Sequence, residues 1–66
     1  MQILLNGKTR QLTKQLSILE LLQQLELTGK RVAVEVNQAI VPRSEHEQHL
    51  LNEGDTVEIV HAIGGG

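Results

Sequence analysis

Cysteine and aromatic residues are absent from this sequence of 66 residues. Without cysteine, the chain forms no disulfide and no thiolate metal site, and it has no thiol nucleophile of its own. Without aromatic rings, it lacks the usual stacking platforms for bases and the usual aromatic anchors of protein interfaces. Any surface that binds a partner is therefore expected to be aliphatic and polar.

Long hydrophobic runs and clusters of like charge are also missing. No apolar stretch approaches the roughly 20 residues needed to cross a bilayer, and residues 1–5 contain no basic segment or cleavage site of a signal peptide. The lysines and arginines are scattered, and the formal net charge is -2, which argues against a nucleic-acid-binding surface. We expect a cytoplasmic protein that binds neither membranes nor nucleic acids.

The length allows one compact domain, which depends on leucine, isoleucine and valine packing because no metal or disulfide supports it. The chain opens with alternating apolar residues, followed by Asn6-Gly7, which supplies the two positive-φ positions of a type I′ turn. Residues 1–12 are therefore predicted to form a hairpin. We predict one domain over residues 1–63 and a flexible glycine tail over residues 64–66.

A helix is predicted to begin at Ile18. Ser17 and Glu20 have the spacing of a capping box, and the leucines before and after them fit a hydrophobic staple. Apolar residues recur on one face of this helix at Ile18, Leu21, Leu22 and Leu25. Gly29 is predicted to end the helix.

The second half of the chain alternates between short strands and turns. Residues 32–36 alternate as a half-buried strand, Asn37-Gln38 forms a turn, and residues 39–41 form a short edge strand that Pro42 ends. A second capping-box spacing at Ser44 predicts a helical turn through His49.

After that turn, Leu50-Leu51 is expected to return apolar groups to the core. Residues 52–55 then form a turn, and a last strand starts at residue 56 and continues toward Ile63. The order predicts an α+β protein with a mixed sheet, one main helix packed across it and a short helical turn. This arrangement is the ubiquitin-like β-grasp.

The chain ends in Gly64, Gly65 and Gly66. Glycines have no side chain to pack and the largest backbone entropy to lose, so we expect a mobile tail. Such a tail is also thin enough to thread a narrow channel and bring Gly66 to the catalytic centre of a partner. Three terminal glycines alone are typical of a frayed end, and their functional interpretation depends on the β-grasp before them.

Chemistry at Gly66 requires activation from outside, because an ionised carboxylate is a poor electrophile. Transfer of an adenylyl group from ATP is one such activation. The sequence has no Gly-rich phosphate loop followed by lysine, and Ser17 and Ser44 are explained as helix caps rather than nucleophiles. We therefore predict a substrate of other enzymes with no permanently bound cofactor.

Four segments together suggest a family. They are Met1-Gln2-Ile3-Leu4 with Asn6, Glu20-Leu21-Leu22 with Gln24-Leu25, Val36-Asn37-Gln38 leading to Ile40-Val41-Pro42-Arg43, and Gly54-Asp55 leading to Gly65-Gly66. In these segments, and in length, the chain resembles the ThiS family of sulfur carriers of thiamine biosynthesis.

The resemblance implies that a ThiF-type adenylyltransferase uses ATP to adenylate Gly66, and that a persulfide sulfur donor converts it to a thiocarboxylate. Thiazole synthase then takes the sulfur. Gly65 corresponds to the second glycine of the diglycine end of the family, whereas Gly64 is an additional glycine. Because a carrier passes between enzymes, we expect a free monomer that forms transient complexes.

Two other functions fit the same pattern. The small subunit of molybdopterin synthase shares the fold, a Val-Asn-Gln segment and the diglycine end, but its relatives tend to be longer with prolines before the glycines. A noncatalytic ubiquitin-like interaction module would instead use the edge near Ile40-Val41 for strand addition. Deletion of Gly66 separates a carrier from the interaction module, because only a carrier would lose its function.

A metal site is a further alternative, because His46 and His49 lie three residues apart with Glu45 beside them and Glu53 nearby in sequence. Two histidines without a firm third ligand are common on surfaces. A solvated polar turn is therefore the preferred interpretation of this segment.

Overall fold

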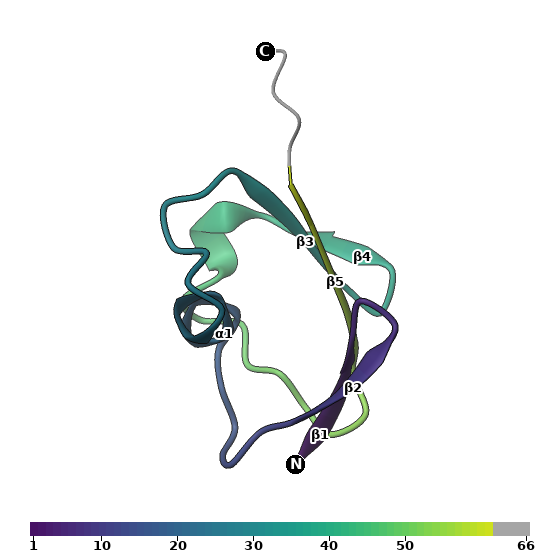
Figure 1. Ribbon diagram of the computed structural model, residues 1–66. Helices are drawn as coiled ribbons and strands as arrows, with labels where there is room; N and C mark the ends of the chain where they lie inside the picture. The colour runs from purple at the N-terminus through teal and green to yellow at the C-terminus, as the bar shows by residue number, and fades with distance from the viewer. Residues whose placement is uncertain (62–66) are drawn as a thin grey trace.

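A computed structural model describes residues 1–61 of the protein (Figure 1). Its elements are β1 (Gln2–Leu5), β2 (Lys8–Gln11), α1 (Ile18–Gln24), β3 (Val32–Val36), β4 (Ala39–Val41), the 3-10 helix η1 (Arg43–Glu45) and β5 (Thr56–His61). The predicted order of strands, helix and helical turn is confirmed. No helix in residues 1–61 is long and apolar enough to cross a membrane.

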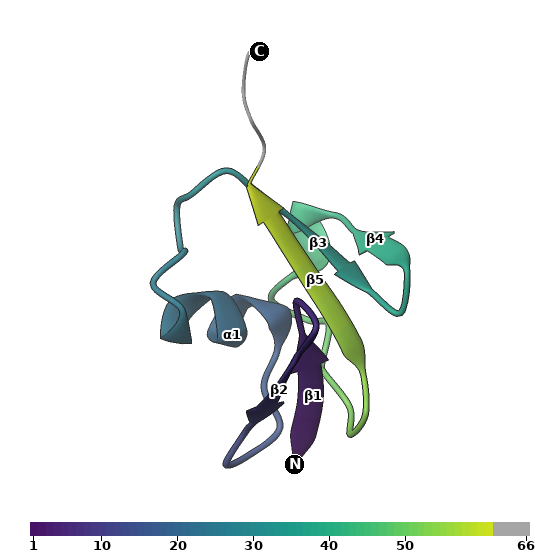
Figure 2. The same ribbon diagram turned by 45° about the vertical axis from the view of Figure 1, so that its right-hand side comes forward.

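The strands form one mixed sheet in the order β2-β1-β5-β3-β4. Strand β5 is parallel to β1 and antiparallel to β3, while β2 and β4 pair antiparallel at the two edges. Helix α1 packs across one face of the sheet and leaves the other face open (Figures 1 and 2). The predicted β-grasp, with the short β4 as an edge strand, is therefore confirmed.

The core between α1 and the sheet is entirely aliphatic. Its members within residues 1–61 are Ile3, Leu12, Leu16, Ile18, Leu21, Leu22, Val34, Val36, Val41, Leu51, Val57 and Ile59. Alternation along β3 and β5 places Val34, Val36, Val57 and Ile59 in this core, as the sequence pattern predicted.

The local signals at the first hairpin and at the start of the helix are confirmed. Asn6 and Gly7 have φ values of 49° and 81°, as a type I′ turn requires. The Glu20 N–H donates to Ser17 Oγ at 3.1 Å, and the Ser17 N–H donates to Glu20 Oε1 at 2.8 Å. This reciprocal pair is the predicted capping box, and it begins α1 at Ile18.

The prediction that Gly29 ends the helix is wrong, because α1 ends at Gln24. Glu26 takes the left-handed conformation at φ 60°. The Leu27 N–H donates to the Leu22 carbonyl at 2.8 Å, and the Glu26 N–H donates to the Gln23 carbonyl at 3.1 Å. These bonds form a Schellman motif with a glutamate in the position that usually holds glycine.

Replacing Glu26 with glycine is expected to stabilise the fold by about 0.5–1 kcal/mol, because glycine adopts φ 60° without the Cβ clash. Urea unfolding measures the change. Gln23→Gly is the matched control, since it places glycine on the exposed helical surface and is expected to cost about 1 kcal/mol. Equal destabilisation by both variants would contradict the Schellman assignment.

The second helical turn differs from its prediction in how it begins. It starts at Arg43 after Pro42, and no side chain caps it, so Ser44 is not a helix cap. The chain still turns through this region, because the His49 N–H donates to the Glu45 carbonyl at 2.9 Å. Pro42 itself is the N-cap residue, and its ring fixes its own φ, which is -60°, so the turn begins here without a serine cap.

Only one of the two leucines after this turn enters the core. Leu51 is fully buried, whereas Leu50 remains 50% exposed. The predicted turn over residues 52–55 is confirmed by the bond from the Asp55 N–H to the Asn52 carbonyl at 3.0 Å and by φ 83° at Gly54. Ala62 and Ile63 lie outside the described residues, so the predicted extent of the last strand and the domain boundary at residue 63 stay predictions.

Candidate functional site

Strand β5 occupies the centre of the sheet (Figure 2), and in the sequence it precedes the C-terminal glycines. Its last described residue, His61, is paired with Val32 of β3. The predicted site residues Gly64, Gly65 and Gly66 lie outside the described residues. The structure therefore describes the strand that precedes this segment in the sequence.

Asn6 holds β5 beyond the end of its pairing with β1. Strand β1 pairs with β5 only as far as Leu5 and Val57. Beyond this point, the Ile59 N–H donates to Asn6 Oδ1 at 2.8 Å, and Asn6 Nδ2 donates to the Ile59 carbonyl at 3.3 Å. The side-chain carboxamide of Asn6 thus takes the place of a backbone peptide group beyond the end of β1.

The sequence did not reveal this second role, because the type I′ turn already explains an asparagine before glycine. Asn6→Gly is expected to destabilise the protein by about 1–3 kcal/mol, since glycine tolerates φ 49° but removes both hydrogen bonds. Chemical denaturation measures this loss.

The matched control is Gln38→Gly, at φ 71° in the turn between β3 and β4. Glycine should be neutral or stabilising at this position. If Asn6→Gly behaved in the same way, the carboxamide would not be supporting β5.

A second asparagine fixes the start of β5. The Asn37 N–H donates to the Thr56 carbonyl at 2.7 Å, and the Thr56 N–H donates to Asn37 Oδ1 at 3.0 Å. Asn37 Nδ2 also donates to Asp55 Oδ1 at 3.0 Å. Two segments that carry the family resemblance, Val36-Asn37-Gln38 and Gly54-Asp55, therefore meet at the base of the central strand.

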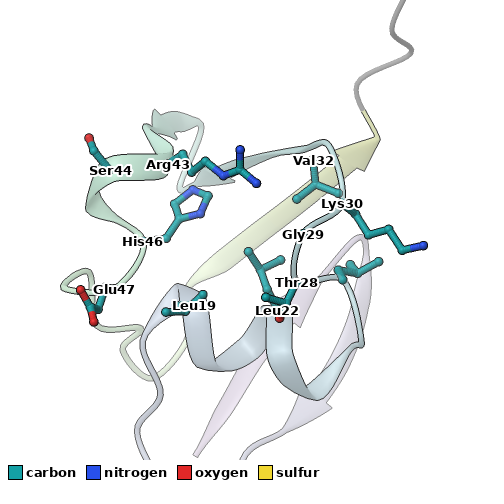
Figure 3. Close-up of a pocket in the computed structure, with 11 residues that line it drawn as sticks. Leu19, Leu22, Thr28, Gly29, Lys30, Val32, Arg43, Ser44, His46 and Glu47 are labelled. Atoms are coloured by element: carbon teal, nitrogen blue, oxygen red, sulfur yellow. The ribbon is translucent and has the colours of Figure 1, made fainter.

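A pocket of about 240 Å³ lies between α1, the loop before β3, and η1 (Figure 3). Leu22 and Val32 contribute apolar surface, and Lys30 and Arg43 contribute positive charge. Ser44 points away from the ring of His46 in this view, so the two do not form a nucleophile and base pair.

The interpretation of His46 as part of a solvated turn is wrong. Its side chain is buried, with 6% exposed, and Nε2 lies 3.0 Å from the Val41 carbonyl oxygen. Because a carbonyl only accepts, this nitrogen is the donor, and the ring ties the turn to β4. Within residues 1–61, no group of three or more histidines and carboxylates could hold a metal, so the alternative that pairs His46 with His49 gains no third ligand.

Comparison with known proteins decides the family. The model of the ThiS family matches residues 3–66, which is nearly the whole chain. The chain belongs to the ThiS family. The sulfur carrier protein ThiS of Escherichia coli is 38% identical over 66 residues, and the alignment covers 100% of both chains.

The chain also matches a part of two larger proteins. The chain is 41% identical over 66 residues to a thiazole synthase of Paramagnetospirillum magneticum, but it spans only 20% of the length of that protein. A thiazole synthase of Magnetococcus marinus is 39% identical over 66 residues, and the match again covers 100% of this chain and 20% of that protein.

A solved ThiS structure confirms the ubiquitin-like β-grasp. The crystal structure of the thiamine biosynthesis protein ThiS from Geobacter metallireducens superposes with a TM-score of 0.87 at 30% sequence identity, and the match covers 100% of both chains. The family that the terminal glycines and the four sequence segments suggested is therefore shown by sequence and by structure.

Proposed function

We propose that this ThiS family member carries sulfur for the thiazole moiety of thiamine on the carboxyl group of Gly66. One observation carries the proposal: the alignment with the sulfur carrier of Escherichia coli covers the whole of both chains. Gly66 therefore falls at the end of the alignment, where that carrier also ends.

The carrier acts as a co-substrate, and enzymes of other kinds supply the chemistry. A ThiF-type adenylyltransferase joins the Gly66 carboxylate to the adenylyl group of ATP with release of pyrophosphate, which creates an acyl group that a nucleophile can attack. The outer sulfur of a persulfide donor then attacks this acyl group and displaces AMP, which gives an acyl disulfide. A thiol reductant cleaves the S–S bond, so that the thiocarboxylate stays on Gly66 and the donor sulfur leaves in a disulfide with that thiol. The Ser17 hydroxyl accepts a hydrogen bond from the Glu20 N–H and so caps the helix. This structural role supports the view that the chain does not supply the nucleophile itself.

Thiazole synthase is the acceptor in this proposal. Support comes from the thiazole synthases of Paramagnetospirillum magneticum and Magnetococcus marinus, each of which contains a region that matches all of this chain. A carrier domain and the enzyme that uses its sulfur gain a high effective concentration when they share one chain.

Growth of bacteria tests the proposal. The host is a strain that lacks its own thiazole sulfur carrier, supplied with the activating enzyme and thiazole synthase from the organism of this chain. Expression of the chain is expected to restore growth without thiazole.

The same chain should not rescue a strain that lacks the small subunit of molybdopterin synthase. Rescue of the second strain in place of the first would overturn the assignment to thiamine. Failure in both strains, with the protein folded and present, would favour an interaction module.

A further inference from the structure

The sheet face opposite α1 is open, and we call it the open face. Strand alternation and the pairing register place Gln2, Leu4, Thr9, Gln11, Ala33, Glu35, Ile40, Thr56, Glu58 and Val60 on it. The residues that alternate with them along the strands, such as Ile3, Val34 and Val57, are buried on the side of the helix.

Aliphatic side chains lie exposed on the open face. Ile40 is 70% exposed, Val60 is 52% exposed and Leu4 is 39% exposed. Ala33 lies directly opposite Val60 in the register and adds to the apolar area. The direct pair of Ala33 and Val60, with Ile40 on the strand beyond, is exposed apolar surface that another protein can cover.

Two carboxylates face each other near the middle of this surface. Glu35 of β3 pairs directly with Glu58 of β5, and Ile40 pairs with Glu35 on its other side. Side chains at directly opposed positions have Cβ atoms about 4.5–5.5 Å apart, and like charges there destabilise a sheet.

Within residues 1–61, the strand positions of the open face hold no lysine or arginine. On β2, Lys8 and Arg10 pair with Leu5 and Ile3, which places them on the other face. The free protein therefore keeps an unfavourable acidic pair among exposed aliphatic residues.

We propose that the open face is the docking surface for thiazole synthase, and that this enzyme inserts a lysine or arginine between Glu35 and Glu58. The inference rests on the proposed function and adds the surface and the chemistry of its partner. A cation placed there would relieve the repulsion of the free protein, while aliphatic residues of the enzyme cover Ile40 and Val60.

Strand β5 gives this surface its connection with Gly66. It carries Glu58 and Val60, and its last described residue, His61, precedes Gly66 by five residues. Five residues span at most about 17 Å when extended. An enzyme seated on the open face is thus within reach of the sulfur-bearing terminus.

Thiazole synthase is the proposed partner of the open face because two relatives with that name contain a region that matches all of this chain. Two domains joined in one chain meet repeatedly, and a complementary contact between them is favoured by their effective concentration. The open face offers exposed aliphatic side chains and a pair of opposed carboxylates, which such a contact can use.

Neutralising both carboxylates tests the inference. Isothermal titration calorimetry of the full chain with thiazole synthase is expected to show at least about tenfold weaker binding for Glu35→Gln/Glu58→Gln, with less dependence on salt. The melting temperature of the variant should be equal to or above that of the parent protein, because the like-charge pair is gone.

The matched control is Glu45→Gln/Glu47→Gln, which removes the same charge from the exposed turn around η1 and should bind like the parent protein. Ile40→Ser should also weaken binding, whereas Leu50→Ser removes an exposed leucine outside the open face and should not. Unchanged affinity of Glu35→Gln/Glu58→Gln, or equal weakening in the control, would overturn the inference.

Two further measurements separate this inference from the proposed function. Sulfur loading of Gly66, read from the intact mass, tests the carrier role without thiazole synthase. Normal loading with unchanged affinity for thiazole synthase would overturn only the docking surface. Weaker binding to the activating enzyme alone would overturn thiazole synthase as the occupant.

Discussion

Deletion of Gly66 is expected to lower sulfur loading by at least about a hundredfold while the domain remains folded. The shortened chain still ends in two glycines, Gly64 and Gly65, so the chemistry of the end group is unchanged. The carboxylate, however, lies about 3.5 Å closer to the domain at full extension. A displacement of even 1 Å from the reactive position can cost about a hundredfold in rate.

Gly64→Ala provides the control, because this variant keeps the full length and also ends in Gly65-Gly66. It should load sulfur at a rate within a few-fold of the parent protein. Single-turnover loading followed by mass spectrometry measures both variants. Equal loading of the shortened chain would show that the reach of the terminus does not limit the reaction, and would remove Gly66 from its proposed role.

Leu51→Ala is expected to destabilise the protein by about 2–5 kcal/mol. Leu51 is fully buried, and its N–H donates to the Leu16 carbonyl at 2.8 Å, so the backbone around the cavity is held in place. A domain of 66 residues has a total stability of about 3–10 kcal/mol. This one truncation therefore removes a large part of the stability, and it leaves much of the chain unfolded at 37 °C.

The neighbouring residue provides the control for this prediction. Leu50→Ala makes the same chemical change at a side chain that is 50% exposed, and it should cost less than about 1 kcal/mol. Thermal and urea unfolding of both variants measure the difference. Similar losses at the two positions would contradict the assignment of Leu51 to the core and Leu50 to the surface.

Signals that act within a few residues could be predicted from the sequence. The type I′ turn at Asn6-Gly7 and the capping box between Ser17 and Glu20 are examples, because each depends on dihedral angles and hydrogen bonds inside one short segment. Alternation in β3 and β5 likewise identified the core side of each strand, since burial follows the pleat.

Errors arose where two local signals competed or where a partner was distant in sequence. Gly29 is a suitable helix terminator, yet Glu26 takes the left-handed position because Leu27 packs against the core there. Ser44 has the spacing of a cap, but Pro42 already directs the chain into the turn. His46 was placed in solvent, because its bond to the Val41 carbonyl exists only after β4 and the turn have met.

The candidate site depended on the resemblance as much as on physics. The three terminal glycines alone indicate only a chain end without side chains, and the family segments gave Gly66 its proposed role. Contacts between distant residues explain part of that resemblance. Asn6 bonds to Ile59, and Asn37 bonds to Thr56, so two of the family's asparagines hold the strand that leads to Gly66.

The most direct test of the account is the intact mass of the protein after incubation with a ThiF-type enzyme, ATP, a persulfide sulfur donor and a thiol reductant. The account predicts a gain equal to exchange of one oxygen for sulfur, which fragmentation assigns to Gly66. The gain should require ATP and should be absent when Gly66 is deleted. An unchanged mass, with the activating enzyme proven active on another carrier, would contradict the assignment of Gly66 as the sulfur-bearing residue.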